Sequence, residues 1–116
     1  MGKTILAIDD DANMLQFYKV LLAQFGDVRT AADMQQARRQ LTGVDLIILD
    51  FYLGRDQERI QDIVPELRRT APVVLCSGVQ DPGVQGLGTA LGIAGYWNKG
   101  PEHDKLQSLV RSVLKP

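Results

Sequence analysis

The sequence has almost no cysteine: Cys76 is the only one among its 116 residues, so no disulfide can form within the chain. A lone, unpaired cysteine is usual in a reducing compartment. The first residues lead straight into an apolar strand and do not form a signal peptide. No apolar run reaches the roughly 20 residues that a transmembrane helix needs. We therefore expect a cytoplasmic protein without membrane association.

An excess of charge of either sign is also absent. Thirteen Lys and Arg side chains are balanced by fourteen Asp and Glu side chains, and the formal net charge is −1. Such a chain has no overall field that attracts nucleic acid, and no basic helix follows Lys115. We expect no direct binding of nucleic acid. Histidine is scarce as well: His103 stands alone without neighbouring metal ligands, so we assign it no metal or catalytic role.

The remaining composition is typical of one compact domain. A chain of this length can bury a single hydrophobic core and is too short for two. Hydrophobic residues make up 45% of the sequence, the usual proportion for a globular protein. Residues 1–116 are therefore predicted to form one domain, uninterrupted by repeats or linkers.

The stretch from Val44 to Asp50 is the strongest structural signal in the chain. Its apolar run is continuous rather than alternating, and it is rich in β-branched residues. This pattern is typical of a strand that is buried on both faces, at the centre of a parallel sheet. Four further strands are predicted at residues 3–8, 28–31, 72–76 and 93–98.

Apolar residues at helical spacing fill the intervals between these strands. The first helical stripe consists of Met14, Phe17, Tyr18, Leu21, Leu22 and Phe25. Either Asp10 or Asp11 is expected to cap this helix, and Gly26 to end it. A second, short helix is expected between Asp33 and Gly43.

The later helices carry more interruptions. Pro65 lies inside the third stripe, where it predicts a kink or a late start. Four glycines lie between residues 79 and 92, so any helix there is expected to be short and easily loosened. The last stripe consists of Leu106, Leu109, Val110, Val113 and Leu114.

Five strands that alternate with helices predict an α/β fold, a doubly wound sandwich with a parallel sheet. Polar residues follow the strands: Asp9 and Asp10 the first, Asp50 the third, Ser77 the fourth and Lys99 the fifth. The carboxyl ends of parallel strands share one edge of a sheet, where such folds bind ligands. With the first and third strands as neighbours, the acidic pair faces Asp50 across a crevice.

Three carboxylates and one ammonium leave this crevice negatively charged. A hard divalent cation compensates such a charge, and Mg²⁺ suits it because it binds a few carboxylate oxygens together with phosphate oxygens. The sequence therefore predicts a Mg²⁺ site formed by Asp9, Asp10 and Asp50.

The whole chain resembles the receiver domain of two-component response regulators. Five marks carry the resemblance in the same order along the chain: Ile8-Asp9-Asp10, Asp50 at the end of its strand, Ser77-Gly78, Tyr96 and Lys99. The resemblance implies the flavodoxin-like (βα)5 sandwich. It also implies a signalling phosphoprotein of a phosphorelay, and not an enzyme that turns over a small substrate.

The resemblance assigns a role to each marked residue. Asp50 is the phosphoacceptor and attacks the phosphohistidine of a partner. Asp10 binds Mg²⁺ directly, Asp9 binds it through water, and the backbone carbonyl of Tyr52 is a further ligand.

The resemblance also implies the groups that respond to phosphorylation. Lys99 pairs with Asp50 and then with a phosphoryl oxygen, Ser77 donates a hydrogen bond to another, and Tyr96 changes rotamer as Ser77 moves. The implied partners are a sensor histidine kinase or phosphotransfer protein, a downstream output protein or domain, and a second copy bound through the fourth and fifth helices.

The sequence departs from the family pattern after the lysine. Lys99-Gly100-Pro101 stands in place of the usual Lys-Pro step, so the family's cis bond cannot form in the normal way and the direction of the Lys99 side chain is open.

Each assignment has a simpler alternative. The acidic triplet could serve as a helix cap, although a cap needs only one carboxylate. Lys99 could be a surface lysine, and Tyr96 and Trp97 could be core aromatic residues, which we prefer for Trp97. A degenerate receiver that acts as a phosphorylation-independent interaction module is the alternative function. A Mg²⁺-dependent hydrolase with an aspartyl nucleophile is less favoured, because the chain has no room for a cap over a substrate.

Overall fold

A computed structural model describes residues 2–51, 58–78 and 82–115 of the chain. Five strands form one parallel sheet of order β2-β1-β3-β4-β5, which confirms the predicted doubly wound α/β fold. The strands are β1 (Lys3–Ile8), β2 (Gly26–Ala31), β3 (Leu46–Asp50), β4 (Val73–Ser77) and β5 (Gly95–Asn98).

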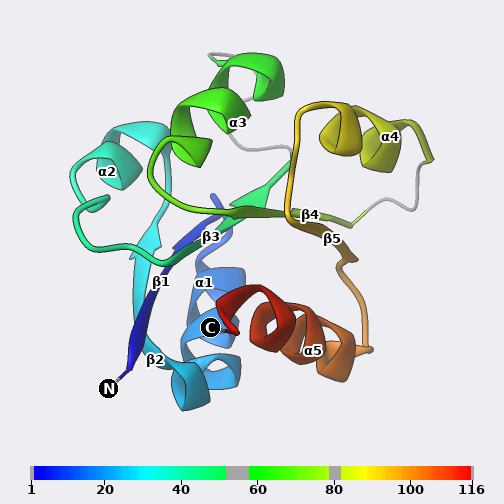
Figure 1. Cartoon of the computed structure of the whole chain (residues 1–116). Helices are drawn as coiled ribbons and strands as arrows, with labels where there is room; N and C mark the ends of the chain where they lie inside the picture. The colour runs from blue at the N-terminus through cyan, green and yellow to red at the C-terminus, as the bar shows by residue number, and fades with distance from the viewer. Residues whose placement is uncertain (1, 52–57, 79–81, 116) are drawn as a thin grey trace.

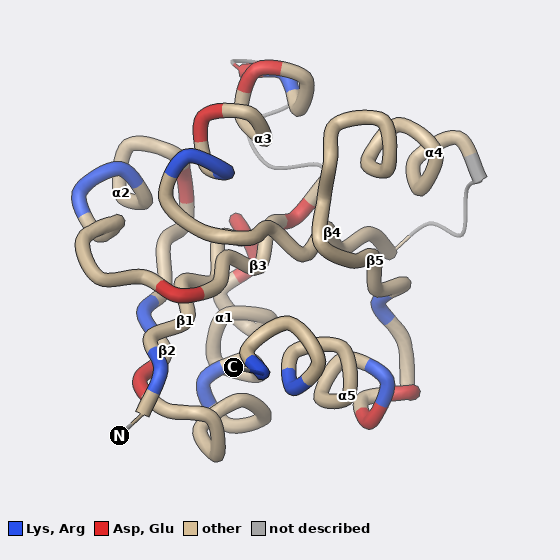
Figure 2. Tube along the Cα trace, viewed as in Figure 1, with Lys and Arg blue, Asp and Glu red and all other residues tan. Residues whose placement is uncertain are grey.

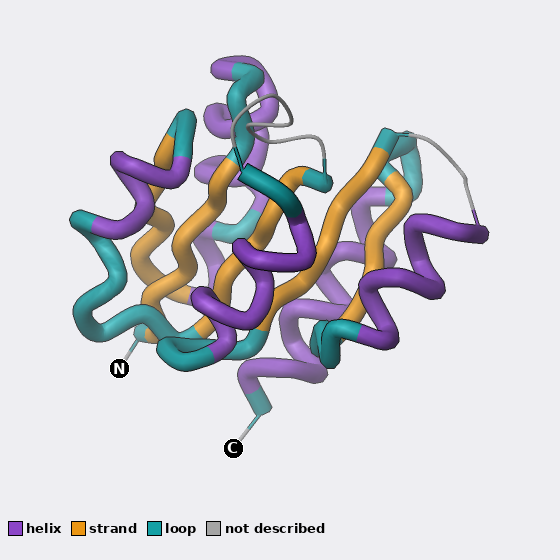
Figure 3. Tube along the Cα trace, turned by 90° about the horizontal axis from the view of Figure 1, so that it is seen from above, coloured by secondary structure: helices purple, strands orange, loops and turns teal. Residues whose placement is uncertain are grey.

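The helices cover both faces of the sheet (Figure 1). They are α1 (Ala12–Leu21), α2 (Met34–Arg38), α3 (Ile60–Arg68), α4 (Pro82–Ala90) and α5 (His103–Leu114), with a 3-10 turn η1 (Ala23–Phe25) after α1. Helices α1 and α5 lie on one face and α2, α3 and α4 on the other, and Figure 3 shows the strands side by side between these two layers. None of the helices in the described ranges is long and apolar enough to cross a bilayer.

The two helical layers explain why the central strand is apolar throughout. Along β3, Leu46 and Ile48 pack into the core under α1 and α5, whereas Ile47 and Leu49 pack into the core on the opposite face. Side chains alternate between the faces of a strand, so a strand covered on both faces needs apolar residues at every position. Every residue of β3 is buried.

Helix ends were predicted less accurately than strands. The first helix ends at Leu21, and Gly26 instead ends η1, with φ at 143°. The second helix is capped by Asp33 as predicted, but it ends at Arg38, well before Gly43. The helix therefore covers only five residues of the interval between Asp33 and Gly43. The third helix begins at Ile60 and continues through Pro65, so the proline does not set its start.

Candidate functional site

The strand register brings the predicted site residues to one edge of the sheet. Ile8 pairs with Leu49 across β1 and β3, so the residues that follow them, Asp9 and Asp50, leave the sheet next to each other. Asp50 is itself aligned with Cys76 of β4. The amide of Lys99 donates a hydrogen bond of 2.7 Å to the Ser77 carbonyl at the end of β4. All these residues therefore lie at the carboxyl ends of the strands, as the sequence predicted.

Asp9 is a buried carboxylate that is held from two sides. Its side chain is 1% exposed. One carboxylate oxygen accepts a hydrogen bond from the Asp11 amide at 2.9 Å, and the other accepts one from Lys99 at 2.7 Å. Because both oxygens are engaged, the carboxylate is fixed in orientation before any ligand arrives.

The three consecutive aspartates, at positions 9 to 11, make different contacts. Asp11 caps α1, since its side chain accepts a hydrogen bond of 2.9 Å from the Asn13 amide. Capping therefore needs neither Asp9 nor Asp10. Asp10 is exposed, and one oxygen each from Asp9, Asp10 and Asp50 lies within 4.8 Å of the others. Three carboxylate oxygens at this spacing fit a hard cation such as Mg²⁺.

Lys99 is the cation of the cluster. Its Nζ lies 2.7 Å from Asp9 Oδ2 and 3.1 Å from Asp50 Oδ1, and its side chain is 18% exposed. Burial alone lowers the pKa of the ammonium. The hydrogen bond to Asp9 and the charges of Asp50 and Asp9 outweigh that effect and raise the pKa, so Lys99 stays charged at neutral pH. The inserted Gly100 therefore does not direct the side chain away from the site.

Comparison with known proteins identifies relatives of this fold by structure and not by sequence. No model of a protein family matches the sequence, and no curated protein does. Among solved structures, a response regulator receiver domain protein from Clostridium thermocellum is 24% identical, with 97% of this chain and 94% of that chain covered at a TM-score of 0.83. The receiver domain of DrrB in its BeF3-activated form is 24% identical over the full length of both chains, at a TM-score of 0.88.

A third structure is the response regulator TrrA from Thermotoga maritima in complex with Mg(2+)-BeF. It is 23% identical, with 97% of this chain and 99% of that chain covered at a TM-score of 0.82. The chain has the receiver-domain fold. At these identities the likeness establishes the fold alone.

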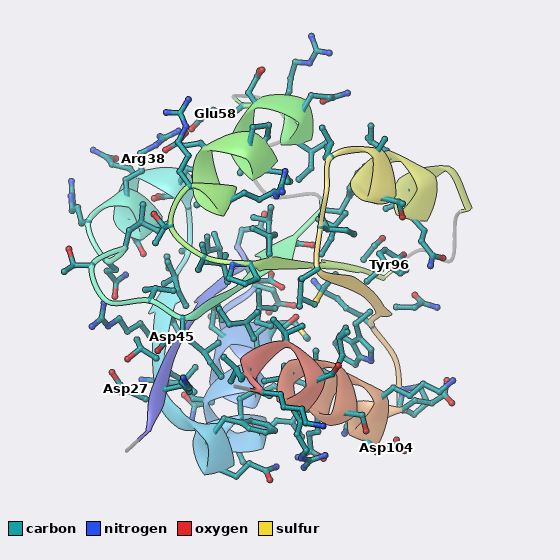
Figure 4. The ribbon with its side chains drawn as sticks, viewed as in Figure 1. Asp27, Arg38, Asp45, Glu58, Tyr96 and Asp104 are labelled. Atoms are coloured by element: carbon teal, nitrogen blue, oxygen red, sulfur yellow. The ribbon has the colours of Figure 1, made fainter. Side chains whose placement is uncertain are left out.

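Two further residues that the resemblance marked, Ser77 and Tyr96, lie on β4 and β5. Ser77 is fully buried at the carboxyl end of β4, one residue past the partner of Asp50. Tyr96 on β5 is partly buried, lies between β5 and α4, and packs against the core on the α2–α4 face (Figure 4). Tyr52, whose carbonyl was expected to bind the metal, lies outside the described residues.

Two buried polar groups, the Cys76 thiol and the Tyr18 hydroxyl, lie beneath the site. Cys76 is fully buried, and burial raises the pKa of its thiol to about 12. Tyr18 from α1 is 1% exposed, and burial likewise raises the pKa of its hydroxyl. Apolar spacing alone marked Tyr18 as a core residue and carried no signal for its hydroxyl.

These buried groups predict a loss of stability at alkaline pH. Because the pKa of the Cys76 thiol is higher in the folded protein, the unfolded chain releases this proton first as pH rises. The stabilisation of the folded state by the protonated thiol is therefore complete below about pH 8.5 and is lost as pH rises towards 12. We expect the free energy of unfolding in urea to fall by about 2 kcal/mol between pH 8.5 and 10.5, and to fall less steeply in Cys76→Ala. Parallel pH profiles for the two proteins would contradict this assignment.

An ion-pair network connects α2 with α3 and with the residues before α3. No sequence pattern indicates it, because its members are far apart in the chain. Arg38 of α2 faces Glu58, which precedes α3 (Figure 4), and its guanidinium also binds Glu66 of α3 at 2.7 Å. These hydrogen bonds raise the pKa of Arg38, and the hydrogen bond from Arg38 lowers the pKa of Glu66. The network joins α2 to the segment that follows the Asp50 loop.

Proposed function

We propose that this chain is a phosphoacceptor of a phosphorelay, in which Asp50 receives a phosphoryl group from a phosphohistidine. One observation carries the proposal: Lys99 Nζ lies within hydrogen-bond distance of both Asp9 and Asp50, at the point where three carboxylate oxygens lie within 4.8 Å of one another. A cap for α1 or a solvated turn does not require this arrangement.

The reaction is a displacement at phosphorus. An Asp50 carboxylate oxygen forms the new bond to phosphorus, the bond from phosphorus to the donor's imidazole nitrogen breaks, and the imidazole leaves with that electron pair. The enzyme-like contribution of the chain is positioning and charge neutralisation. Asp50 is 5% exposed and is held by Lys99, so the nucleophile is oriented before the donor binds. Lys99 then neutralises the charge that arrives with the phosphoryl group.

The carboxylates of Asp9, Asp10 and Asp50 fit Mg²⁺ as oxygen ligands, with the Tyr52 carbonyl as a further proposed ligand. When bound, the ion would lower the repulsion between the carboxylates and the phosphoryl oxygens. Asp9 is suited to this task because its orientation is fixed from two sides.

Ser77 and Tyr96 are proposed to pass the change to the surface. Ser77 lies at the strand end beside the site, and Tyr96 lies on the adjacent strand under α4. A movement of Ser77 could therefore be transmitted to β5 and α4 through side chains that pack against one another. The proposed partners are a cytoplasmic sensor histidine kinase or phosphotransfer protein and an output protein or domain, with a homodimer through α4 and α5.

Intact-mass analysis tests the proposal. We expect that incubation with phosphoramidate and Mg²⁺ adds the mass of one phosphoryl group to the wild type and nothing to Asp50→Asn, because the amide is a poor nucleophile. Asp33→Asn is the matched control, since Asp33 caps α2 away from the site and this variant should be phosphorylated like the wild type. An unmodified wild type, or equal modification of Asp50→Asn, would contradict the proposal, and an unmodified wild type would favour the phosphorylation-independent interaction module.

A further inference from the structure

A second site lies at the opposite edge of the sheet, where the strands begin. A groove of about 610 Å³, here called the basic groove, opens between the start of β1, η1 and the C-terminal end of α5. Its main lining residues are Lys3, Phe25, Ser108, Arg111, Ser112 and Lys115. Lys3 precedes Asp9 by six positions along β1, which corresponds to about 20 Å along the strand.

The charge of the basic groove differs from that of the chain as a whole. The molecule has a net charge of −1, yet the described residues that line the groove include three cations, Lys3, Arg111 and Lys115, and no acidic residue. Within the described ranges, none of the three cations forms an ion pair. All three side chains are exposed, so their charges are accessible from solvent.

The walls of the groove are held in place by contacts between distant segments. The Arg111 guanidinium lies over the Phe25 ring, 5.5 Å from its centroid, and Gln107 donates a hydrogen bond of 3.2 Å to the Leu21 carbonyl. Gly26 lets the chain after η1 approach the backbone of Lys3 more closely than a side chain would permit. The groove thus combines an aromatic wall, against which Arg111 lies, with two exposed lysines.

We propose that the basic groove binds an acidic peptide segment of a partner protein. Carboxylates of the segment pair with Lys3, Arg111 and Lys115, the serine hydroxyls bind its backbone, and an apolar side chain packs beside Phe25. Charge complementarity favours this occupant, and the volume is in the range of ligand sites.

The charge along α5 favours a short acidic segment over an extended polyanion. Figure 2 shows acidic positions at the N-terminal end of α5, where Lys105 is the one basic residue, and basic positions alone at its C-terminal end, close to the end of the chain. Glu102 and Asp104 account for that acidic end. A nucleic acid running along α5 would meet repulsion there, whereas a peptide confined to the groove would not.

This inference goes beyond the proposed phosphoacceptor function. Because the basic groove and the Asp50 site lie at opposite edges of the sheet, peptide binding should be independent of phosphorylation. The chain would then hold one partner constantly through the groove while Asp50 is switched.

Fluorescence anisotropy with a labelled Glu-Glu-Leu-Glu-Glu peptide tests the proposal. We expect saturable binding to the full chain, and binding at least about tenfold weaker for the double variant Arg111→Glu/Lys115→Glu, because two attractions become repulsions. Lys105→Glu is the matched control: Lys105 lies on the same helix, pairs with Glu102 at 3.0 Å and does not line the groove, so its variant should bind like the wild type. Circular dichroism of each variant confirms that it is folded.

The outcomes separate this inference from the proposed function. Peptide affinity should be the same in Asp50→Asn as in the wild type, and the double variant should still be phosphorylated on Asp50. No peptide binding, equal loss in the Lys105→Glu control, or equal binding of a Gln-Gln-Leu-Gln-Gln peptide would overturn the inference. The inference would also be overturned if the groove did not bind the peptide but bound phosphatidylserine vesicles, or a second copy of the chain as measured by sedimentation.

Discussion

Replacing Lys99 with methionine should raise the affinity for Mg²⁺ and at the same time slow phosphorylation of Asp50. Lys99 is the cation that pairs with Asp9 and Asp50, and its removal leaves three carboxylates without their ammonium. A divalent ion then enters a more negative site, and at short range a single charge changes the interaction energy by several kcal/mol. We expect Mg²⁺ to bind at least about tenfold more tightly, as measured by isothermal titration calorimetry.

The rate of phosphorylation should change in the opposite direction. A positioned cation that stabilises transferring oxygens typically contributes about a hundredfold or more to the rate. We therefore expect phosphoryl transfer to Lys99→Met from phosphoramidate to be slower by about that factor, followed by intact mass over time. Without Mg²⁺ the variant should also lose roughly 3 kcal/mol of stability, because the buried carboxylates lose the ammonium that offsets their charge.

Lys105→Met is the control, because Lys105 is exposed and pairs with Glu102 alone. It should match the wild type in affinity, rate and stability. If Mg²⁺ affinity and phosphorylation both fell in Lys99→Met, or if neither changed, Lys99 would not have the role assigned to it.

Replacing Gly26 with alanine should be the most destabilising small substitution away from the site. Gly26 has φ at 143° and ψ at −145°, a conformation that residues with a side chain rarely adopt. An added Cβ would also collide with the backbone of Lys3 on the neighbouring strand. Strain and overlap together should cost roughly 3 kcal/mol in the free energy of urea unfolding.

Gly86→Ala is the matched control for this effect. Gly86 lies inside α4 and is exposed, and a Cβ added there would meet no atom from another part of the chain within 4 Å. Alanine there should stabilise the protein by about 0.5–1 kcal/mol, because glycine is a poor helix former. Equal stability of Gly26→Ala and the wild type would show that the turn between η1 and β2 relaxes without cost.

The strands and the site could be predicted because their signals are local. An apolar run buried on both faces marks β3, and a carboxylate at its end marks the edge where ligands bind. The register of β1 and β3 then brings Asp9 beside Asp50 without further information. The position of Lys99 was harder to predict, because the inserted Gly100 altered the expected backbone while the side chain still reached both carboxylates.

Helix ends and cross-chain contacts could not be predicted in the same way. Gly43 was expected to end the second helix, but that helix ends at Arg38. The Arg38 side chain forms ion pairs with Glu58 and Glu66, which are distant in the sequence. Contacts of this kind depend on where distant segments pack, and no spacing in the sequence encodes them. The basic groove has the same origin, since Lys3 and Arg111 come from opposite ends of the chain.

Locating the modified residue tests the central claim most directly. The chain is incubated with phosphoramidate and Mg²⁺, the acyl phosphate is reduced with borohydride, and peptide mass spectrometry identifies the aspartate that has been converted to homoserine. We predict conversion at Asp50 alone, and none when Mg²⁺ is withheld. Conversion at Asp9 or Asp10, or no conversion at any aspartate of the folded chain, would contradict the account.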